Sequence, residues 1–257
     1  MAASEGPAGE RPVALITGAS YGIGGATAAG LAADGFDIVV TDLDAGHLAV
    51  TQRRVEAAGA RCLPLALDVR DQQSIERCFA DALSEFAHVD LIVNNAGVPS
   101  PRKLIVETTR EDWNSVIDVN LTGAFFFSQA FARRLIEQKR PGHVISLAST
   151  FGIVGQSNVS VYGISKAAVS HMTKMMAIEW AELGIRANAV APGATTTETR
   201  AKYHHDPVIG PRARAKIPIG RFAMPDEVAA AIRYLASPGA AYVNGHTLVI
   251  DGGLTVA

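Results

Sequence analysis

Apolar residues are distributed along the chain in two alternating patterns. Short uninterrupted apolar runs are typical of strands that are buried on both faces of a sheet. The longer stretches between them have the spacing and the residue types of helices. These patterns predict strands at residues 13–16, 36–41, 62–67, 89–93, 144–147, 185–190 and 248–250. They predict helices at residues 45–58, 72–86, 110–138 and 225–236, a first helix that ends near Ala33, and a helix that carries Tyr162 and ends near Leu183.

Strands that alternate with helices at this spacing predict a parallel sheet, because parallel neighbours need a crossover connection. Right-handed crossovers leave few topologies. The expected fold is α/β, a Rossmann-type doubly wound parallel sheet of about seven strands with helices on both faces. No linker divides the chain, so residues 11–257 are predicted to form one domain. Residues 1–10 are small and polar and are predicted to be a flexible tail.

Composition excludes several classes of partner. The 257 residues are 48% hydrophobic and 19% charged, which suits a globular domain, and the net charge of -2 gives no reason to expect nucleic acid or an anionic membrane. No uncharged apolar run reaches ~18 residues, so no membrane span is predicted. Cys62 and Cys78 have neither metal-site nor disulfide spacing and are interpreted as small buried hydrophobic residues. The predicted setting is therefore a reducing one, the cytoplasm.

A glycine-rich turn follows the first predicted strand and opens the first helix. Gly18, Gly22 and Gly24 have the spacing Gly-x-x-x-Gly-x-Gly. Glycine permits positive φ and lets backbone N–H groups approach a pyrophosphate, and the helix N-terminus favours the same anion. This context predicts a dinucleotide site rather than a turn that serves packing alone.

The end of the second strand indicates which dinucleotide binds. Asp42 lies 24 residues after Gly18, where a carboxylate can accept hydrogen bonds from the adenosine ribose hydroxyls and would repel a 2′-phosphate. Tyr21 and Leu43 supply no cation for such a phosphate. We therefore predict NAD as the cofactor, with NADP less favoured.

A tyrosine and a lysine are four residues apart at the start of an apolar helical segment. This spacing puts Tyr162 and Lys166 on one face of a helix, one turn apart. An ammonium beside a phenol favours the phenolate, so the pKa of Tyr162 is expected to fall towards neutrality, which suits a general acid/base. Ser149 follows an apolar run and offers a hydroxyl that can hold a substrate oxygen. Alone, the pair is as compatible with a solvated helix face.

These motifs together resemble the short-chain dehydrogenase/reductase family, from about Arg11 to Gly253. Several further segments match in order: Asp68-Val69 resembles the pair that meets the adenine, residues 94–97 resemble the segment beside the cofactor, and residues 192–197 resemble the nicotinamide-side loop. The cofactor-binding residues that this resemblance implies are Gly18, Ser20, Tyr21, Gly22, Ile23, Gly24, Asp42, Asp68, Val69, Asn95, Ala96, Gly97, Tyr162, Lys166, Pro192, Gly193, Thr195 and Thr197.

The resemblance also implies a catalytic tetrad and a reaction. Asn120 matches the family's catalytic-helix asparagine, and Ser149 lies thirteen residues before Tyr162, the family's usual spacing. In such a tetrad Ser149 orients the substrate oxygen and Tyr162 exchanges its proton. Lys166 lowers the Tyr162 pKa and binds the nicotinamide ribose, while Asn120 holds a water in a proton relay. The implied activity is hydride transfer between NAD(H) and a small secondary alcohol or ketone.

The segment after residue 193 is polar, broken by prolines and without clear periodicity. In the family the equivalent segment closes over the substrate. Its arginines, Arg200, Arg212 and Arg214, either meet an anionic substrate or are surface charges. The adjacent His204 and His205 are interpreted as solvated loop residues, and no metal site is predicted.

The long helices carry more large apolar residues than one core needs. They include Phe125, Phe126, Phe127, Met172, Met175 and Met176. These residues either form a wide core face or, as the family resemblance implies, pair helices between subunits. A homotetramer is predicted on the second interpretation.

Two alternative functions are weighed against the leading one. The first is an NADP-dependent 3-oxoacyl-thioester reductase, which Asp42 disfavours. The second is a nucleotide-sensing protein without catalysis, which the presence of both Tyr162 and Lys166 disfavours.

Overall fold

All seven strands belong to one parallel sheet. The structure, a computed structural model, describes residues 11–204 and 206–257, with the backbone alone at 202–204; the predicted tail, residues 1–10, and the histidine side chains at 204 and 205 lie outside what is described. The strands are β1 Val13–Thr17, β2 Asp37–Asp42, β3 Cys62–Ala66, β4 Leu91–Asn94, β5 Gly142–Leu147, β6 Ile185–Pro192 and β7 Thr247–Ile250. Their order is β3-β2-β1-β4-β5-β6-β7, and every pairing is parallel. The predicted fold class is confirmed.

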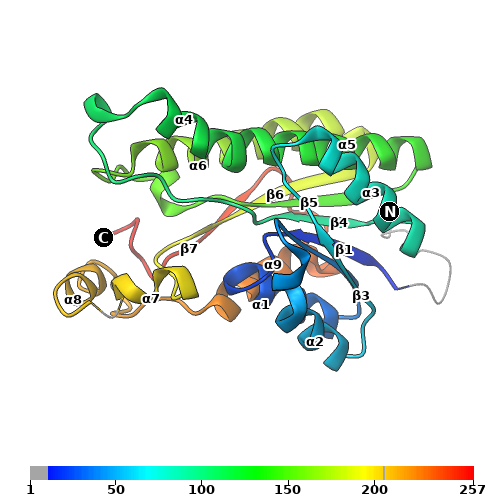
Figure 1. Ribbon diagram of the computed structural model, residues 1–257, viewed down its shortest axis with the longest axis horizontal. Coiled ribbons are helices and arrows are strands. Elements are labelled where there is room, and N and C mark those ends of the chain that lie inside the picture. The colour runs from blue at the N-terminus through cyan, green and yellow to red at the C-terminus, as the bar shows by residue number, and fades with distance from the viewer. Residues whose placement is uncertain (1–10, 205) are drawn as a thin grey trace.

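Helices cover both faces of this sheet (Figure 1). One layer contains α3 Gln72–Phe86, α4 Arg110–Ile117, α5 Ala124–Gln138 and α6 Ser160–Trp180. The other contains α1 Gly22–Ala33, α2 Ala49–Ala57 and α9 Pro225–Ala236, and two short helices, α7 Glu198–His204 and α8 Ile209–Arg214, lie beyond the end of β7. The strand order reverses between β1 and β4, and in such sheets ligands bind outside the carboxyl ends of the strands at that point.

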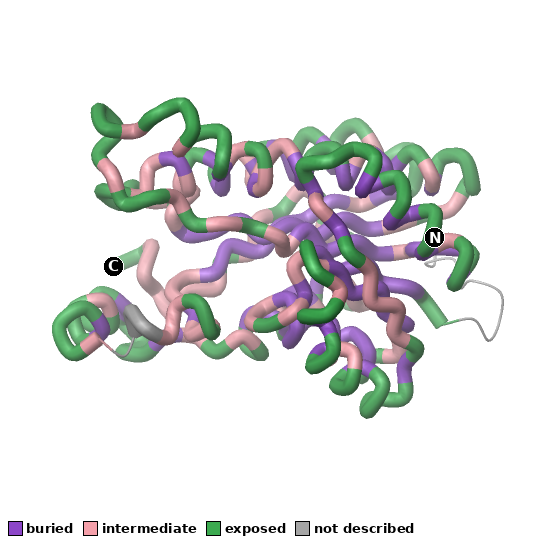
Figure 2. The backbone as a smooth tube through the Cα atoms, in the orientation of Figure 1, coloured by how far each residue is buried: buried purple, intermediate pink, exposed green. Residues whose placement is uncertain are grey.

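The uninterrupted apolar runs are explained by two cores, one on each face. Val13 and Leu15 of β1 pack with α3, α5 and α6, whereas Ala14 and Ile16 of the same strand pack with α1 and α9. Successive strand residues point to opposite faces, so a strand covered on both sides can be apolar at successive positions. Figure 2 shows the resulting buried strands between helices whose outer sides are exposed.

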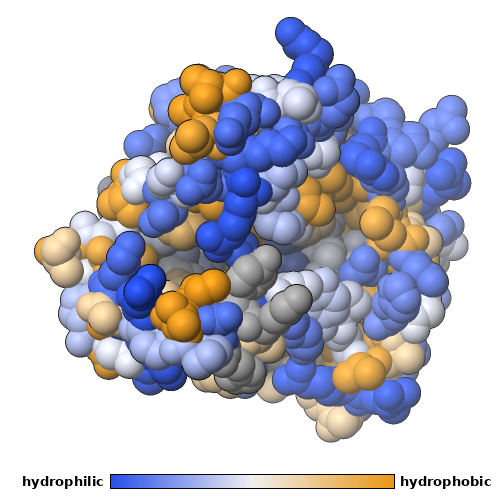
Figure 3. Space-filling view, turned by 60° about the vertical axis from the view of Figure 1, so that its left-hand side comes forward, coloured by the Kyte–Doolittle hydropathy of each residue, from blue (hydrophilic) through white to orange (hydrophobic). Residues whose placement is uncertain are grey.

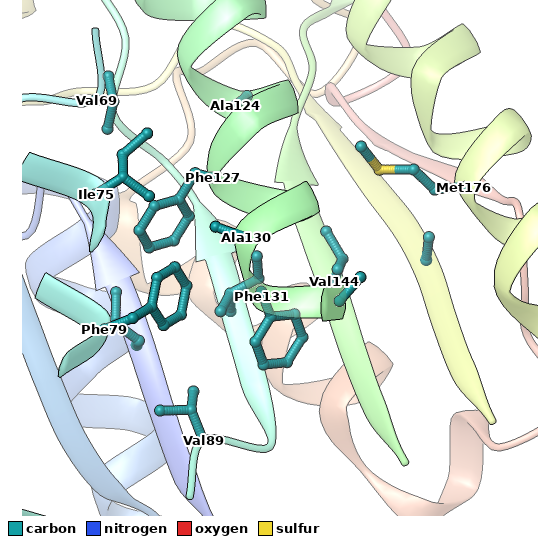
Figure 4. Packing of buried hydrophobic residues seen from close by; sticks show 14 of the residues in the cluster. Val69, Ile75, Phe79, Val89, Ala124, Phe127, Ala130, Phe131, Val144 and Met176 are labelled. Carbon is teal, nitrogen blue, oxygen red and sulfur yellow. The ribbon is translucent and has the colours of Figure 1, made fainter. Parts of the chain in front are cut away.

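Aromatic stacking joins α3 to α5 on the first face. The rings of Phe79 and Phe127 stack with their centroids 4.8 Å apart, and Phe131 continues the row (Figure 4). Phe127, Met172 and Met176 are buried, so half of the apolar residues that were assigned to a possible subunit contact belong to the core instead. Phe125, Phe126 and Met175 are each 42% exposed.

Two predicted segments differ from the structure in kind. The helix expected at 110–138 is interrupted by a π-helical turn, Asp118–Gly123, between α4 and α5. The segment expected to be irregular contains α7 and α8. Asp206 accepts hydrogen bonds from the backbone of Val208 and Ile209 at the start of α8, and Pro211 falls in the first turn, where a missing N–H costs little. The helices predicted at 72–86 and 225–236 match in full, 3-10 turns occupy residues 45–48 before α2 and 181–183 after α6, and the strand boundaries shift by at most two residues.

Candidate active site

The predicted site residues converge on the carboxyl edge of the sheet. The glycine turn follows β1, Asp42 ends β2, Asp68 follows β3, residues 95–97 follow β4, and Ser149 follows β5. This edge lies on the left in Figure 1 and turns towards the viewer in Figure 3, where the surface is mainly hydrophilic with apolar side chains in separate patches.

The turn between β1 and α1 fits a pyrophosphate. Gly18 and Gly22 have φ of 64° and 57°, in the left-handed region, and a Cβ at Gly18 would lie 2.9 Å from the Ala96 Cα. No side chain caps α1, and its first turn contains no acidic residue. The unpaired N–H groups of that turn and the helix dipole therefore remain available to an anion.

The next two strand ends carry the carboxylates that were predicted to meet the adenosine. Asp42 accepts a hydrogen bond of 2.5 Å from the Ser20 hydroxyl, which joins the end of β2 to the glycine turn. Asp68 is held by Arg70 through its guanidinium at 2.6 Å, and this ion pair lowers the pKa of the Asp68 carboxyl. Leu43, beside Asp42, is 67% exposed. The edge therefore offers carboxylates that can accept hydrogen bonds from ribose hydroxyls. Among the described residues, Asp42 has no unpaired cation beside it in the sequence.

Residues 95–97 are fastened to the glycine turn. The Asn95 side chain donates to the carbonyls of Thr17 and Gly18 at 2.9 and 2.7 Å. The buried Thr17 hydroxyl accepts from the backbone N–H groups of Asn95 and Ala96. These bonds lock β1 to β4 at the point where the strand order reverses.

The π-helical turn positions Asn120. Its side chain accepts a 2.8 Å hydrogen bond from the Val98 N–H and donates to the Val98 carbonyl at 3.0 Å and to the Ser165 hydroxyl at 3.2 Å. The extra residue of a π turn re-aims side chains, and such turns occur frequently at functional sites. Asn120 is thus turned towards the end of β4 instead of continuing the face of a regular helix.

Tyr162 and Lys166 lie on α6 as predicted, with Ser149 opposite them. The Lys166 ammonium is 5.8 Å from the centre of the Tyr162 ring and donates a 2.6 Å hydrogen bond to the Leu147 carbonyl. The edge of Phe151 meets the Tyr162 ring, with the ring centres 6.4 Å apart. Gly97 approaches both polar groups, because a Cβ there would lie 3.3 Å from Asn120 Oδ1 and 3.6 Å from Lys166 Nζ.

The expected fall in the Tyr162 pKa is wrong for the chain alone. Burial raises the pKa of the phenol, and a hydrogen bond with Ser149 and the charge of Arg200 lower it by less. Burial also lowers the pKa of Lys166 to about 8. The ammonium is therefore a weaker cation than its sequence position suggests, and the Leu147 carbonyl is its hydrogen-bond partner.

The loop after β6 closes the site on the remaining side. Thr195 bridges to Ala223, and the Thr197 methyl would lie 3.2 Å from a Cβ at Gly22. Gly193 is needed because a Cβ there would lie 2.9 Å from the Asp251 Cα. Pro192 ends β6 at this edge. The loop thus passes directly over the turn that fits the pyrophosphate.

Sequence reasoning missed two residues of this edge, Thr17 and Ser165, which hold Asn95 and Asn120. Asn94, which lies in the predicted segment 94–97, donates from a buried position to Ser128 and Ser146. Thr17 is the polar residue that ends an apolar run, and that contrast is the signal that could have found it. Among the described residues no group of three or more potential metal-ligating side chains occurs, and no helix is long and apolar enough to cross a membrane.

Comparison with known proteins agrees with this arrangement. A family model described as enoyl-(acyl carrier protein) reductase matches residues 18–255. The chain is 38% identical to 3beta-hydroxysteroid dehydrogenase 1 of Eggerthella lenta, over 94% of this chain and 93% of that protein. It is 39% identical to cis-4-hydroxycyclohexanecarboxylate dehydrogenase of Sinomonas cyclohexanicum, over 95% and 96% of the two chains.

A solved structure has the same fold. It is a gluconate 5-dehydrogenase from Burkholderia cenocepacia in complex with NADP and tartrate, with a TM-score of 0.90, 33% identity and 96% coverage of both chains. The chain belongs to the short-chain dehydrogenase/reductase family and is an oxidoreductase of alcohol and carbonyl groups that uses a nicotinamide cofactor.

Proposed function

We propose that the chain interconverts secondary alcohols and ketones with NAD(H) and that Tyr162 is its general acid/base. The observation that carries the proposal is the convergence of Ser149, Tyr162 and Lys166 at the edge where the glycine turn fits a pyrophosphate. The cofactor supplies hydride chemistry, and the protein must then manage one proton on the substrate oxygen.

Each member of the tetrad has a distinct part in this proposal. Ser149 acts on the Tyr162 phenol, so the two hydroxyls would both donate to a carbonyl oxygen of the substrate. Tyr162 gives its proton to that oxygen during reduction and takes it back during oxidation. Lys166, 5.8 Å from the centre of the Tyr162 ring, would bind the nicotinamide ribose, and Asn120, fixed to Val98, would hold the water of a proton relay to Lys166.

The cofactor residues follow from the same edge. The turn from Gly18 to Gly24, including Ser20, Tyr21, Gly22 and Ile23, would hold the pyrophosphate. Asp68 and Val69 would border the adenine, and residues 95–97, 192–193, 195 and 197 would border the nicotinamide half.

The preference for NAD over NADP rests on Asp42. Its carboxylate is fixed by Ser20 at the end of β2, where a 2′-phosphate would meet a like charge. The gluconate 5-dehydrogenase relative contains NADP, so an NADP-linked reductase is the competing outcome.

Known relatives suggest which substrates to try first. Their names cover a hydroxysteroid, a hydroxycyclohexanecarboxylate and gluconate. All three are cyclic or polyhydroxy small molecules with a secondary alcohol, and these form the opening substrate panel.

We also propose that residues 11–257 form one catalytic domain that assembles as a homotetramer in the cytoplasm. Exposed apolar residues on α5 and α6 support a helix pairing between copies, since Phe125, Phe126 and Met175 are each 42% exposed and Ile178 is 72% exposed. Tyr242, fully exposed near the C-terminal strand, supports a second contact. A monomer mass by light scattering at micromolar concentration would contradict the tetramer.

The proposal is tested by assaying the panel with NAD and NADP separately. We expect at least about tenfold higher kcat/KM with NAD, since like-charge repulsion of this kind is worth about 1.4 kcal/mol or more. Replacing Asp42→Ala should narrow that ratio with little effect on turnover. An NADP preference in the unaltered chain refutes the role of Asp42, and the absence of turnover with any alcohol or ketone refutes the reaction.

A further inference from the structure

We propose that Ser165 is a positioning residue for the reaction. Its buried hydroxyl holds the Asn120 amide against the turn of α6 that carries Tyr162 and Lys166, and turnover falls when that hydroxyl is lost although cofactor and substrate still bind. This inference rests on the proposed function, because it assigns one more residue to the reaction of the same site.

The Ser165 hydroxyl makes two hydrogen bonds inside the protein. The side chain is fully buried, with 0% of its surface exposed. It donates to the Tyr162 carbonyl at 2.7 Å, within the same turn of α6, and it lies 3.2 Å from the side-chain nitrogen of Asn120. A hydroxyl has one hydrogen to give, so with that hydrogen on the Tyr162 carbonyl the oxygen can only accept from Asn120. Ser165 therefore presents a fixed acceptor to the π-helical turn.

The hydrogen bonds of Asn120 fix which way its amide faces. The Val98 N–H can only donate, so the atom 2.8 Å from it is the amide oxygen. The amide nitrogen then donates to the Val98 carbonyl at 3.0 Å and to Ser165, which uses both of its hydrogens. Two of these three bonds go to the loop after β4. Among the described residues, Ser165 is the hydrogen-bond partner that ties the Asn120 side chain to α6.

This orientation matters because the Asn120 oxygen lies beside the Lys166 ammonium. A Cβ at Gly97 would be 3.3 Å from that oxygen and 3.6 Å from the Lys166 nitrogen, so the two atoms border the same point. An amide oxygen near an ammonium is favourable, whereas the amide hydrogens of a reversed side chain would repel it. A reversed amide would also place its oxygen against Ser165, whose hydrogen is already committed to Tyr162. Ser165 thus keeps the acceptor that the proposed relay to Lys166 needs.

A serine inside a helix often bonds back to a carbonyl of the preceding turn without any further role. Ser170 does this on the same helix, where its hydroxyl donates to the Lys166 carbonyl at 3.3 Å. Ser165 differs because it also receives a hydrogen bond from another element. Ser170 is therefore the matched control. The same change there removes a bond to the backbone of a tetrad residue and leaves the bonds of Asn120 intact.

The first test separates turnover from binding in Ser165→Ala. Loss of the acceptor leaves a buried amide N–H without its partner and frees the amide to turn, so we expect kcat on a cyclic ketone of the substrate panel to fall about tenfold or more. KM, and NADH affinity followed by nicotinamide fluorescence, should change less than about threefold. Ser165→Cys, with a weaker acceptor of similar size, should give an intermediate kcat. Ser170→Ala should change kcat less than about twofold.

A double-mutant cycle identifies the residue through which Ser165 acts. In an Asn120→Ala background, adding Ser165→Ala should lower kcat by less than about twofold, because the amide that Ser165 positions is already gone. Losses that multiply across the two changes overturn the inference and assign Ser165 to the shape of α6 alone. Parallel losses in kcat, KM and NADH affinity overturn it as well, since a distorted site weakens every step.

A measurement without turnover keeps the inference separate from the proposed function. In protein that contains isotopically labelled asparagine, the Asn120 side-chain amide is assigned by NMR from its contacts with Val98. Its hydrogens should exchange with solvent about tenfold or more faster in Ser165→Ala and at an unchanged rate in Ser170→Ala. An unchanged rate in Ser165→Ala overturns the inference. No turnover of any ketone by the unaltered chain, with the exchange difference intact, refutes the proposed function and leaves the placement of Asn120 by Ser165 standing.

Discussion

The two ends of strands β5 and β6 each carry a group of buried polar side chains, but the two groups are satisfied in different ways. At the amino end, His143 lies between the Arg186 guanidinium at 3.1 Å and the Asn188 amide at 3.0 Å. Arg186 also donates to the carbonyls of Ala240 and Val243. At the carboxyl end, the Lys166 ammonium has the Leu147 carbonyl at 2.6 Å.

This difference separates structural from reactive polar groups. Asn188 uses its whole amide, since it donates to the Val243 carbonyl and accepts from the His246 N–H, so the amino-end network is closed within the chain. The carboxyl end instead holds a lysine with a pKa lowered to about 8 and a tyrosine with a raised pKa. Groups of this second kind are completed by a ligand.

Breaking the closed network should have the largest effect on stability. Replacing Asn188→Ala leaves the His246 N–H without its acceptor and removes a donor from the Val243 carbonyl, which keeps Arg186, so we expect the free energy of unfolding to fall by about 3 kcal/mol. Turnover per folded molecule should be unchanged. Urea unfolding measures the first quantity, and Asn114→Ala, an exposed control on α4, should change it by less than about 0.5 kcal/mol.

The outcome that would contradict the comparison is lost turnover in folded Asn188→Ala. The amino-end network would then be part of the reactive group.

Removing the buried charge at the carboxyl end should raise the free energy of unfolding, whereas Asn188→Ala lowers it. The pKa of Lys166 is about 8 in the folded chain against 10.5 ordinarily, so its burial costs stability at neutral pH. We expect Lys166→Met to raise the free energy of unfolding at pH 7 by about 2 kcal/mol, somewhat less than the pKa difference implies because Leu147 loses its donor. Turnover should be almost abolished.

The pH dependence of this effect identifies its cause. Below pH 8 both states hold the proton and the full cost is present; between about 8 and 10.5 the folded lysine is neutral while the unfolded one is charged, so the cost disappears as the pH rises. The stability of the unaltered chain should therefore approach that of Lys166→Met over this window. If the difference in unfolding free energy between the two chains stayed constant from pH 8 to 10.5, burial of the Lys166 charge would not be its cause.

The smallest effect is expected from titrating His143. Burial, and then the charge of Arg186, hold the pKa of His143 well below 6.5, because a protonated ring would face two donors. The unfolded chain binds this proton first as the pH falls, so stability is highest above about 6.5 and drops by up to about 1.4 kcal/mol per pH unit below it. His143→Gln should flatten the slope of unfolding free energy against pH between 6.5 and 5. An unchanged slope in His143→Gln would show that other groups cause the pH dependence of stability in this range.

Sequence alone predicted the places in the fold of the candidate cofactor residues far better than the structure of the segment after β6. The glycine turn, Asp42 and Asp68 lie at ends of strands, and strand ends are set by apolar runs and the local turn chemistry that follows them. Tyr162 and Lys166 were placed correctly because a helix fixes the spacing of their side chains.

The remaining features depend on contacts between distant segments. In the π-helical turn, Asn120 forms hydrogen bonds with Val98 and Ser165. The spacing of apolar residues in the sequence does not indicate either contact. The pKa of Tyr162 is raised because the assembled fold buries the phenol. The position of Lys166 in the sequence does not indicate how deeply Tyr162 is buried.

The most direct test of the central claim is a single-turnover experiment on the Tyr162 phenol. Cofactor deuterated at the transferring position of the nicotinamide is mixed with a ketone and excess protein, and the alcohol is analysed by NMR. The account predicts one deuterium on the carbinol carbon with the unaltered chain. With Tyr162→Phe at saturating cofactor, it predicts alcohol formation slower by about 10²- to 10⁴-fold. Deuterium transfer at an undiminished rate in Tyr162→Phe would contradict the account, because the proton would then come from another group.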